Sequence, residues 1–291
     1  MFEFFANTFG YVLNFIYNFV GNYGWAIILF TILVKLALLP LSIKQQKAMK
    51  KNAKIQEQVK AIQFKYKNDQ TKMNEEIFSL YKTEKMSPFS GCLTTIVQLI
   101  LLLSIFYLVR SPLTFMKKVP AEVINNYTTQ IQESENNSNK VYPEIEIIRQ
   151  KGAEDESVRI NMDFLGLDLS QIPKENMSDY RVWVIPVLYI ISSFVSIKMT
   201  TNMQNNLTKK KEENTDVIDV TDGKAEKVKE EETEVDVTAK TNKTMSWLMP
   251  IMAISIAIIA PLGLALYWLV NNILMIVERV ALNKLLKSEE E

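Results

Sequence analysis

The stretch WAIILFTILVKLALLPL, residues 25–41, decides the architecture of this chain. Its only charged side chain is Lys35, and nearly all of its other residues are apolar. A helix needs about 20 apolar residues to cross a hydrocarbon core about 30 Å thick, and flanking residues bring this stretch close to that length. Trp25 at its start is typical of interfacial anchors. We therefore predict that residues 25–41 cross a membrane.

Four further apolar runs follow along the chain. Short apolar runs can also be core helices of a soluble protein, but five such runs with Trp or Tyr in or beside most of them favour membrane spans. The predicted spans are 25–41, 92–109, 182–198, 245–260 and 261–277. The sequence therefore predicts an all-α, polytopic membrane protein with five transmembrane helices.

The N-terminal segment, residues 1–24, is apolar but interrupted. Asn7, Asn14 and Asn18 recur at helical spacing among aromatic and aliphatic residues, a pattern that predicts an amphipathic helix lying in the membrane interface. The segment has Glu3 and no lysine, so we do not interpret it as an ordinary secretory signal peptide.

The segment 42–91 is polar and basic, with eleven lysines and five acidic residues. Two apolar stripes at helical spacing flank a break at Asn68–Asp69. The stripes are Ile55, Val59, Ile62 and Tyr66, then Met73, Ile77 and Leu80. Two amphipathic helices joined by a tight turn form a helical hairpin, which we predict for this segment.

Two long polar segments and a short tail complete the chain. We predict an external loop at 110–181, which has nine basic and twelve acidic residues. The segment 199–244 begins with lysines and continues as an acidic, apolar-poor stretch, a composition typical of flexible linkers. Lysines near span ends mark the cytoplasmic side, and they gather in 42–91, at the start of 199–244 and in the tail 278–291. The N-terminus is therefore predicted outside and the C-terminus in the cytoplasm.

Lys35 is the most informative side chain, because a lysine at membrane depth costs about 2.5–3.5 kcal/mol on insertion scales. Snorkelling to the interface is one explanation. However, Lys35 precedes Leu41 by about 9 Å of helix, and a lysine stem covers only part of that distance. Thr31, Lys35 and Ser42 share one helical face. None of the five runs holds Asp or Glu, so we expect Lys35 to have no carboxylate partner and to face a water-filled cavity open to the cytoplasm.

Other polar residues also lie inside the predicted spans, where they must face protein or water. They are Gln98, Ser192, Ser193, Ser196, Ser255, Asn271 and Asn272. Ordinary hydrogen bonding between helices is the alternative to a functional role, particularly for the serines.

Several classes of chemistry find no residues to support them in the sequence. The chain has no histidine and a single cysteine, Cys92, and it has no glycine-rich phosphate loop. We therefore expect no enzyme activity, no cofactor and no metal site. The absence of acids from the five runs argues against ion-coupled transport. The formal net charge is zero, so we expect no direct nucleic-acid partner.

Three segments in the right order resemble the signature segments of the YidC membrane insertases, bacterial relatives of the mitochondrial Oxa proteins. They are Ile32–Leu41, Met86–Cys92 and Pro261–Asn272. The resemblance covers about 23–110 and 180–285. It implies a five-span core around a hydrophilic groove that opens to the cytoplasm and to lipid. It also places Lys35 where the family has a groove arginine, and it makes Thr31 and Trp268 contacts for the incoming client.

The resemblance implies an insertase of the bacterial cytoplasmic membrane that receives client segments in the groove and releases them into lipid. Its partners would be nascent membrane proteins and the lipid bilayer, with the Sec translocon and the ribosome as further candidates. The candidate groove residues are Lys35, Thr31, Gln98, Trp268, Tyr267, Asn271, Ser192 and Ser196. The alternatives are a transporter or channel, for which we find no internal repeat, and an assembly scaffold that does not insert clients.

The lysine asymmetry makes the topology testable. A reporter inserted at Asn137 should be external, and reporters at Asn68 and Asp222 should be cytoplasmic, because lysine-rich flanks stay on the cytoplasmic side. Protease protection in oriented vesicles would measure this. An external reporter at Asn68 would contradict the topology.

Overall fold

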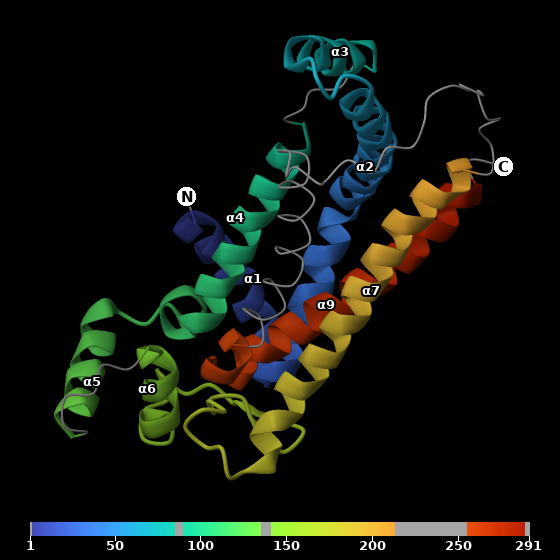
Figure 1. Ribbon diagram of the computed structural model, residues 1–291. Helices are drawn as coiled ribbons and strands as arrows, with labels where there is room; N and C mark the ends of the chain where they lie inside the picture. Colours follow the sequence, from blue (N-terminus) through green and yellow to red (C-terminus); the bar gives the residue numbers. More distant parts are fainter. Residues whose placement is uncertain (1, 85–89, 135–140, 213–254, 289–291) are drawn as a thin grey trace. The chain divides into compact units, whose positions relative to one another are not determined.

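The computed structural model describes residues 2–84, 90–134, 141–212 and 255–288, and within these ranges the chain is mostly helical (Figure 1). The elements in chain order are α1 (Phe2–Val20), α2 (Tyr23–Lys65), α3 (Gln70–Thr83), α4 (Ser90–Arg110), η1 (Leu113–Lys117), α5 (Ala121–Ser134), α6 (Pro143–Lys151), β1 (Asp163–Phe164), β2 (Leu167–Asp168), η2 (Tyr180–Trp183), α7 (Val184–Glu212) and α9 (Leu262–Ser288). The predicted helical class is confirmed. A small antiparallel hairpin of β1 and β2 is an addition that the sequence did not predict.

Among the described residues, three segments are long and apolar enough to cross a bilayer. They are Tyr23–Ala48, Tyr180–Met199 and Leu262–Asn283. The segment Leu99–Arg110 of α4 is apolar but shorter. Most of the predicted fourth span, residues 245–254, lies outside the described residues. The presence of membrane-spanning helices is thus supported, and their number of five stays a prediction.

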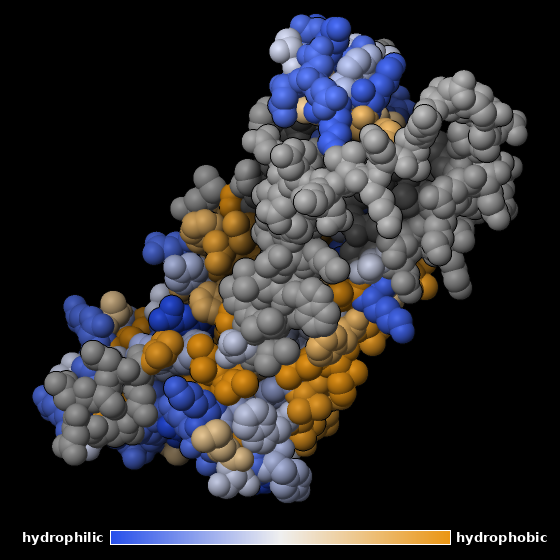
Figure 2. Space-filling view, viewed as in Figure 1, coloured by the Kyte–Doolittle hydropathy of each residue, from blue (hydrophilic) through white to orange (hydrophobic). Residues whose placement is uncertain are grey.

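The face of α7 that carries Val187, Leu188, Ile191, Phe194 and Val195 is exposed and apolar, with 46 to 55% of each residue accessible. The surface over this helix is accordingly dominated by apolar residues in Figure 2. A contiguous exposed apolar face on a long helix is what a lipid environment requires.

Three helices, α2, α7 and α9, run past the ends that the sequence suggested. α2 continues from the first predicted span into the lysine-rich segment, although Pro40 lies inside it and cannot donate a hydrogen bond to the preceding turn. α7 continues to Glu212, beyond the predicted end at 198. A single lost backbone bond, or the start of a polar sequence, does not end a helix whose neighbouring bonds remain.

The chain divides into two compact units. The first comprises Met1–Leu41, Thr94–Ser196 and Ala253–Glu291, and the second comprises Ser42–Leu93 and Ile197–Met252. Both α2 and α7 pass from one unit into the other.

The second unit contains the described part of the lysine-rich segment 42–91, for which a helical hairpin stays a prediction. Its turn lies between the end of α2 and the start of α3, where Asp69 caps α3 by accepting a hydrogen bond from the backbone of Lys72 at 3.0 Å. Lys51 of α2 donates to the carbonyl of Glu84 at 2.6 Å, which joins the two arms. On the α2 arm, Ile55 and Val59 of the predicted apolar stripe are buried.

In the first unit, α1 packs closely against η1. Gly10 lies so near the backbone of Phe115 that a Cβ atom would overlap the Phe115 carbonyl. Lys118, just after η1, donates to Asn7 Oδ1 at 2.6 Å and lies 4.5 Å from the ring centroid of Tyr11. On the free side of α1, the aromatic residues Phe4, Tyr11, Phe15 and Phe19 are 66 to 87% exposed. This aromatic stripe, beside the asparagines, suits a helix that lies in the membrane interface.

The contact between α1 and η1 makes Gly10 a sharp test of this packing. Gly10→Ala should lower the free energy of unfolding by about 1–3 kcal/mol, because the added methyl group overpacks against a backbone carbonyl that cannot rotate away. Thermal unfolding in detergent would measure the change. Thr8→Ala, on the exposed side of the same helix, is the control and should unfold near the wild-type temperature. Equal stability of Gly10→Ala and wild type would contradict the packing.

Candidate functional site

Lys35 lies on α2 and forms an ion pair with Glu278 of α9. The distance between Lys35 Nζ and Glu278 Oε2 is 3.3 Å, and the two side chains are 21% and 15% exposed. Both residues fall inside helical segments that are apolar enough to span a membrane. A charge at membrane depth is thus compensated by the opposite charge on a neighbouring helix.

This pair corrects the expectation that Lys35 has no carboxylate partner. Glu278 is the first residue after the predicted fifth span, 261–277, but α9 continues to Ser288. Near their starts, α2 and α9 are close, because a Cβ atom on Gly263 would lie 3.5 Å from the Tyr23 ring. From Tyr23 to Lys35 is about 18 Å of helix, and from Gly263 to Glu278 is about 22 Å. The two side chains together span this small difference, so Lys35 has a counter-ion and not only water.

Thr31 lies one helical turn before Lys35 and is buried, with 3% of the residue exposed. Its Oγ1 donates to the carbonyl of Ile27 in its own helix at 2.6 Å. This bond satisfies the hydroxyl within α2. The predicted contact between Thr31 and a client is not tested by this geometry and stays a prediction.

α7 and α9 lie side by side and are joined at three successive levels (Figure 1). Nearest the start of the helices, the rings of Tyr189 and Trp268 lie with their centroids 6.0 Å apart. Further along, Asn272 Nδ2 donates to Ser192 Oγ at 3.1 Å and to Ser193 Oγ at 3.0 Å. Further still, Arg279 Nη1 donates to Ser196 Oγ at 3.3 Å. Polar side chains that bond across helices in this way stabilise helix association in membranes. The serines therefore have the interhelical hydrogen bonds that were the alternative to a functional role.

The remaining candidate groove residues have different surroundings. Tyr267 is buried, with 3% exposed, and Asn271 and Trp268 are half-buried. Gln98 belongs to α4, but its side chain lies outside the described part of the chain. Their roles as client contacts stay predictions. The structure does bring Lys35 and the predicted residues of α7 and α9 into one unit.

Sequence reasoning missed two charged residues of this site, Glu278 and Arg279. Both follow the last apolar run, where the sequence predicts the cytoplasmic tail 278–291. The signal was their spacing, since Asn271 and Glu278, and Asn272 and Arg279, are seven residues apart and share faces of one helix. Polar residues just after an apolar run that lie two turns from polar residues inside it indicate that the helix continues.

The segment after β2 is joined to the start of α9 by backbone hydrogen bonds. Leu262 N donates to Gln171 O at 2.9 Å, and Gly263 N donates to Leu169 O at 2.9 Å. Lys174 N donates to Ile258 O at 3.0 Å. These three bonds hold the turn before α9 against the predicted external segment.

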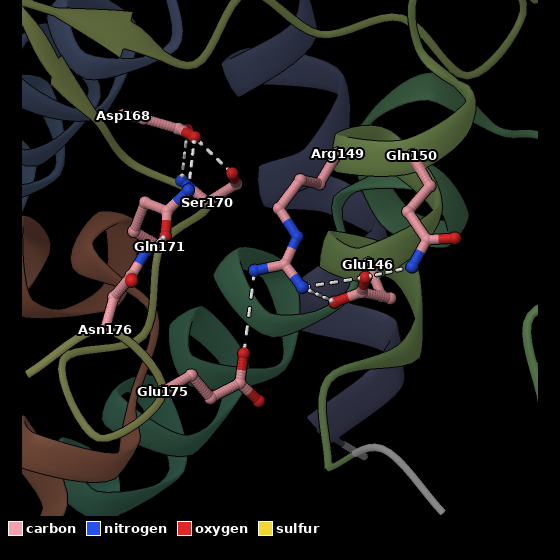
Figure 3. Close-up of polar contacts among 8 residues, drawn as sticks. All are labelled: Glu146, Arg149, Gln150, Asp168, Ser170, Gln171, Glu175 and Asn176. Atoms are coloured by element: carbon pink, nitrogen blue, oxygen red, sulfur yellow. Dashed lines mark hydrogen bonds and ion pairs between the residues drawn. The ribbon is translucent and has the colours of Figure 1, made fainter. Parts of the chain in front are cut away.

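Side chains join parts of this segment to one another (Figure 3). Arg149 of α6 lies between two carboxylates, with 2.6 Å to Glu146 Oε2 and 3.5 Å to Glu175 Oε2. Asp168 accepts hydrogen bonds from the backbone and hydroxyl of Ser170 at 2.9 and 2.6 Å, and from Gln171 at 3.0 Å. The predicted external loop 110–181 is therefore a folded segment in its described part, and its backbone is bonded to the start of α9.

Glu144 of α6 is a buried carboxylate that connects this segment with η1. It accepts hydrogen bonds from the backbone of Leu113 and Thr114 at 2.7 and 3.0 Å, and from Thr114 Oγ1 at 2.6 Å. Burial raises the pKa of Glu144, and these hydrogen bonds oppose that rise. The carboxylate caps the first turn of η1 and so connects α6 with the element against which α1 packs.

No group of three or more His, Cys, Asp or Glu side chains that could hold a metal ion occurs within the described ranges.

The sequence pattern of the family described as 60Kd inner membrane protein matches residues 15–290. The chain belongs to this family.

Curated relatives carry the name Membrane protein insertase YidC. The protein from Chlorobaculum tepidum is 26% identical over 283 residues, which cover 96% of this chain and 36% of that protein. The protein from Cupriavidus necator is 40% identical over 101 residues, 35% of this chain and 18% of that protein. The protein from Burkholderia multivorans is 40% identical over 97 residues, 33% of this chain and 18% of that protein. The resemblance to the YidC family is confirmed, and the matched part spans 18 to 36% of the length of these relatives.

The contacts between α7 and α9 predict a stability effect at Asn272. Asn272→Ala removes two interhelical hydrogen bonds and should lower the free energy of unfolding by about 1 kcal/mol, since such bonds contribute about 0.6 kcal/mol each on average. The denaturation midpoint in mixed micelles would measure it. Asn271→Ala is the matched control, because its side chain is turned about 100° around the helix. An equal loss in both variants would refute the specific role of Asn272.

Proposed function

We propose that this chain is a membrane protein insertase. It receives client segments in a hydrated groove that is open to the cytoplasm and passes them into lipid. The observation that carries the proposal is the position of Lys35, a cation held among apolar spans of the first unit with other polar side chains nearby on α7 and α9. Membership of the family, and the insertase names of its relatives, support the same conclusion.

The distribution of polar groups supports a groove that opens on one side only. The ion pair of Lys35 and the contact of Arg279 lie toward the ends of α2, α7 and α9 that continue into the lysine-rich segments. At the opposite ends, backbone hydrogen bonds join the external segment to the start of α9. Lysine-rich flanks mark the cytoplasmic side, so the polar end is the cytoplasmic one in this proposal.

The mechanism needs no cofactor. A polar stretch of a client needs hydration part-way into the bilayer, and a wet groove supplies it. The Lys35 ammonium attracts acidic residues of the client. Apolar client residues move from the groove into lipid, and the burial of apolar area supplies the driving force at about 25 cal/mol per Å². The partners of the proposed function are nascent membrane proteins and the lipid bilayer.

A transporter is the candidate from another class. The ion pair with Glu278 brings an acid to membrane depth, so the argument from missing acids no longer excludes ion coupling. The contacts at the outer end favour the insertase, because a transporter must open to both sides in turn. Depletion of the chain separates the classes: small one- or two-span clients should remain uninserted. An assembly scaffold would leave them inserted but unassembled.

Substitutions at Lys35 test the groove charge. Lys35→Arg should keep insertion because the charge remains, although its hydrogen-bond geometry differs. Lys35→Leu should reduce insertion of clients with acidic outer tails the most. Lys35→Glu should reduce it further, since it adds repulsion and places a second carboxylate beside Glu278. The measurement is the insertion of an acidic-tailed client by each variant. Unimpaired insertion by Lys35→Leu would show that the charge of Lys35 has no role in insertion.

A thiol at the same position tests hydration. Lys35→Cys in a Cys92→Ser background should react with a water-soluble maleimide added from the cytoplasmic side, because the proposed groove contains water there. A thiol that only membrane-permeant reagents reach would contradict the groove.

A further inference from the structure

The proposed mechanism gives no role to the carboxylate of Glu278, although it is the ion-pair partner of Lys35. In that mechanism Lys35 attracts acidic residues of the client, yet its ammonium already lies 3.3 Å from the carboxylate of Glu278. Both side chains are mostly buried, at 21% and 15% exposed. A carboxylate at this distance cancels most of the field that Lys35 would present to an approaching client.

We propose that Glu278 is a specificity-determining residue that occupies Lys35 in the client-free state and is displaced only by clients with sufficient acidic charge. This inference rests on the proposed function. The residues involved are Lys35 of α2 and Glu278 of α9, and the ligand is a carboxylate of the client tail.

The exchange of one carboxylate for another explains the selectivity. When a client displaces Glu278, one ion pair with Lys35 breaks and a similar one forms. The first client acid therefore adds little net binding free energy. A tail with several acids gains more, because further carboxylates add attraction without breaking a second pair. Discrimination between partners by a competing internal contact is a general source of specificity.

Arg279 makes the displacement feasible. Its guanidinium is held by α7, where it donates to Ser196 Oγ at 3.3 Å and to Ser196 O at 3.5 Å. Arg279 follows Glu278 in the same helix, on the neighbouring face toward α7. A Glu278 carboxylate that leaves Lys35 therefore keeps a cation on its own helix, which a lone acid at membrane depth would lack.

The other interpretation is that the pair only braces α2 against α9. The two interpretations predict opposite signs for Glu278→Gln. If the pair only braces the two helices, the variant weakens the brace and all clients should be inserted less well. If Glu278 competes with the client, the variant removes the competitor, and weakly acidic clients should be inserted better because the full charge of Lys35 is available to them.

The experiment uses the full chain reconstituted in liposomes. Three single-span clients are compared that differ only in carrying zero, one or three acidic residues in the translocated tail. The variants are wild type, Glu278→Gln, Glu278→Asp, Lys35→Leu and the double variant Lys35→Leu with Glu278→Gln. Glu122→Gln removes one carboxylate from the exposed first turn of α5 and is the matched control. Thermal unfolding of each variant confirms that equal amounts of folded protein are compared.

We expect Glu278→Gln to raise insertion of the one-acid client about two- to five-fold, the range of a partly screened ion pair. The zero-acid client should be unaffected, Glu278→Asp should lie between Glu278→Gln and wild type, and Glu122→Gln should match wild type. In the Lys35→Leu background, Glu278→Gln should have no such effect.

An equal loss for all three clients, or no change for any, would overturn the role of Glu278 while leaving the insertase proposal intact. A gain that persists without Lys35 would also overturn it. If wild type inserts no client above empty liposomes, the proposed function itself fails. If Glu278→Gln does not fold, Glu278→Asp replaces it in the comparison, and its insertion of the one-acid client must then exceed that of wild type.

Discussion

Compensation of charge inside a hydrocarbon layer is the constraint on which the rest of this structure depends. A lysine at the centre of a span costs about 2.5–3.5 kcal/mol on insertion scales, so its surroundings must supply water, a counter-ion or both. The chain supplies Glu278 from the helix beside it. That pair fixes which faces of α2 and α9 meet, and the contacts of Asn272 and Arg279 fix α7 against α9. Three helices are thus joined by polar contacts, while their apolar faces remain available to lipid.

The sequence predicted the features that depend on local pattern. Apolar runs predicted the helical class, and three of them coincide with segments long enough to span a bilayer. The break at Asn68–Asp69 lies in the turn between α2 and α3, because Asp69 is a good cap and the apolar spacing changes there. The candidate residues Ser192, Ser196 and Trp268 all lie at the contact of α7 and α9. Helical periodicity carries this information without any knowledge of tertiary contacts.

The features that the sequence did not predict depend on contacts between distant residues. Lys35 and Glu278 are 243 positions apart, and their pairing requires the relative rotation and depth of two helices. A charge ends an apolar run even where the helix continues, so Glu278 was interpreted as tail. The segment 110–181 looked like a polar loop because its buried residues come in short groups such as Ile145, Ile147 and Ile148. Its described part folds because Glu144 and Arg149 connect elements that no local pattern relates.

The magnitudes indicate what charge can and cannot do in the proposed groove. Burying one Leu or Ile side chain contributes about 1.5–3 kcal/mol, so a client segment with many such residues gains far more from lipid than from one ion pair. An ion pair between a client acid and Lys35 adds little net free energy, because the pair with Glu278 must break before the similar new one forms. Electrostatic attraction to Lys35 therefore cannot drive insertion. It can rank clients, because clients of similar hydrophobicity differ by amounts of that size. In the proposed mechanism, the ion pair of Lys35 and Glu278 thus serves client selection as well as helix packing, and the apolar content of the client decides whether insertion proceeds.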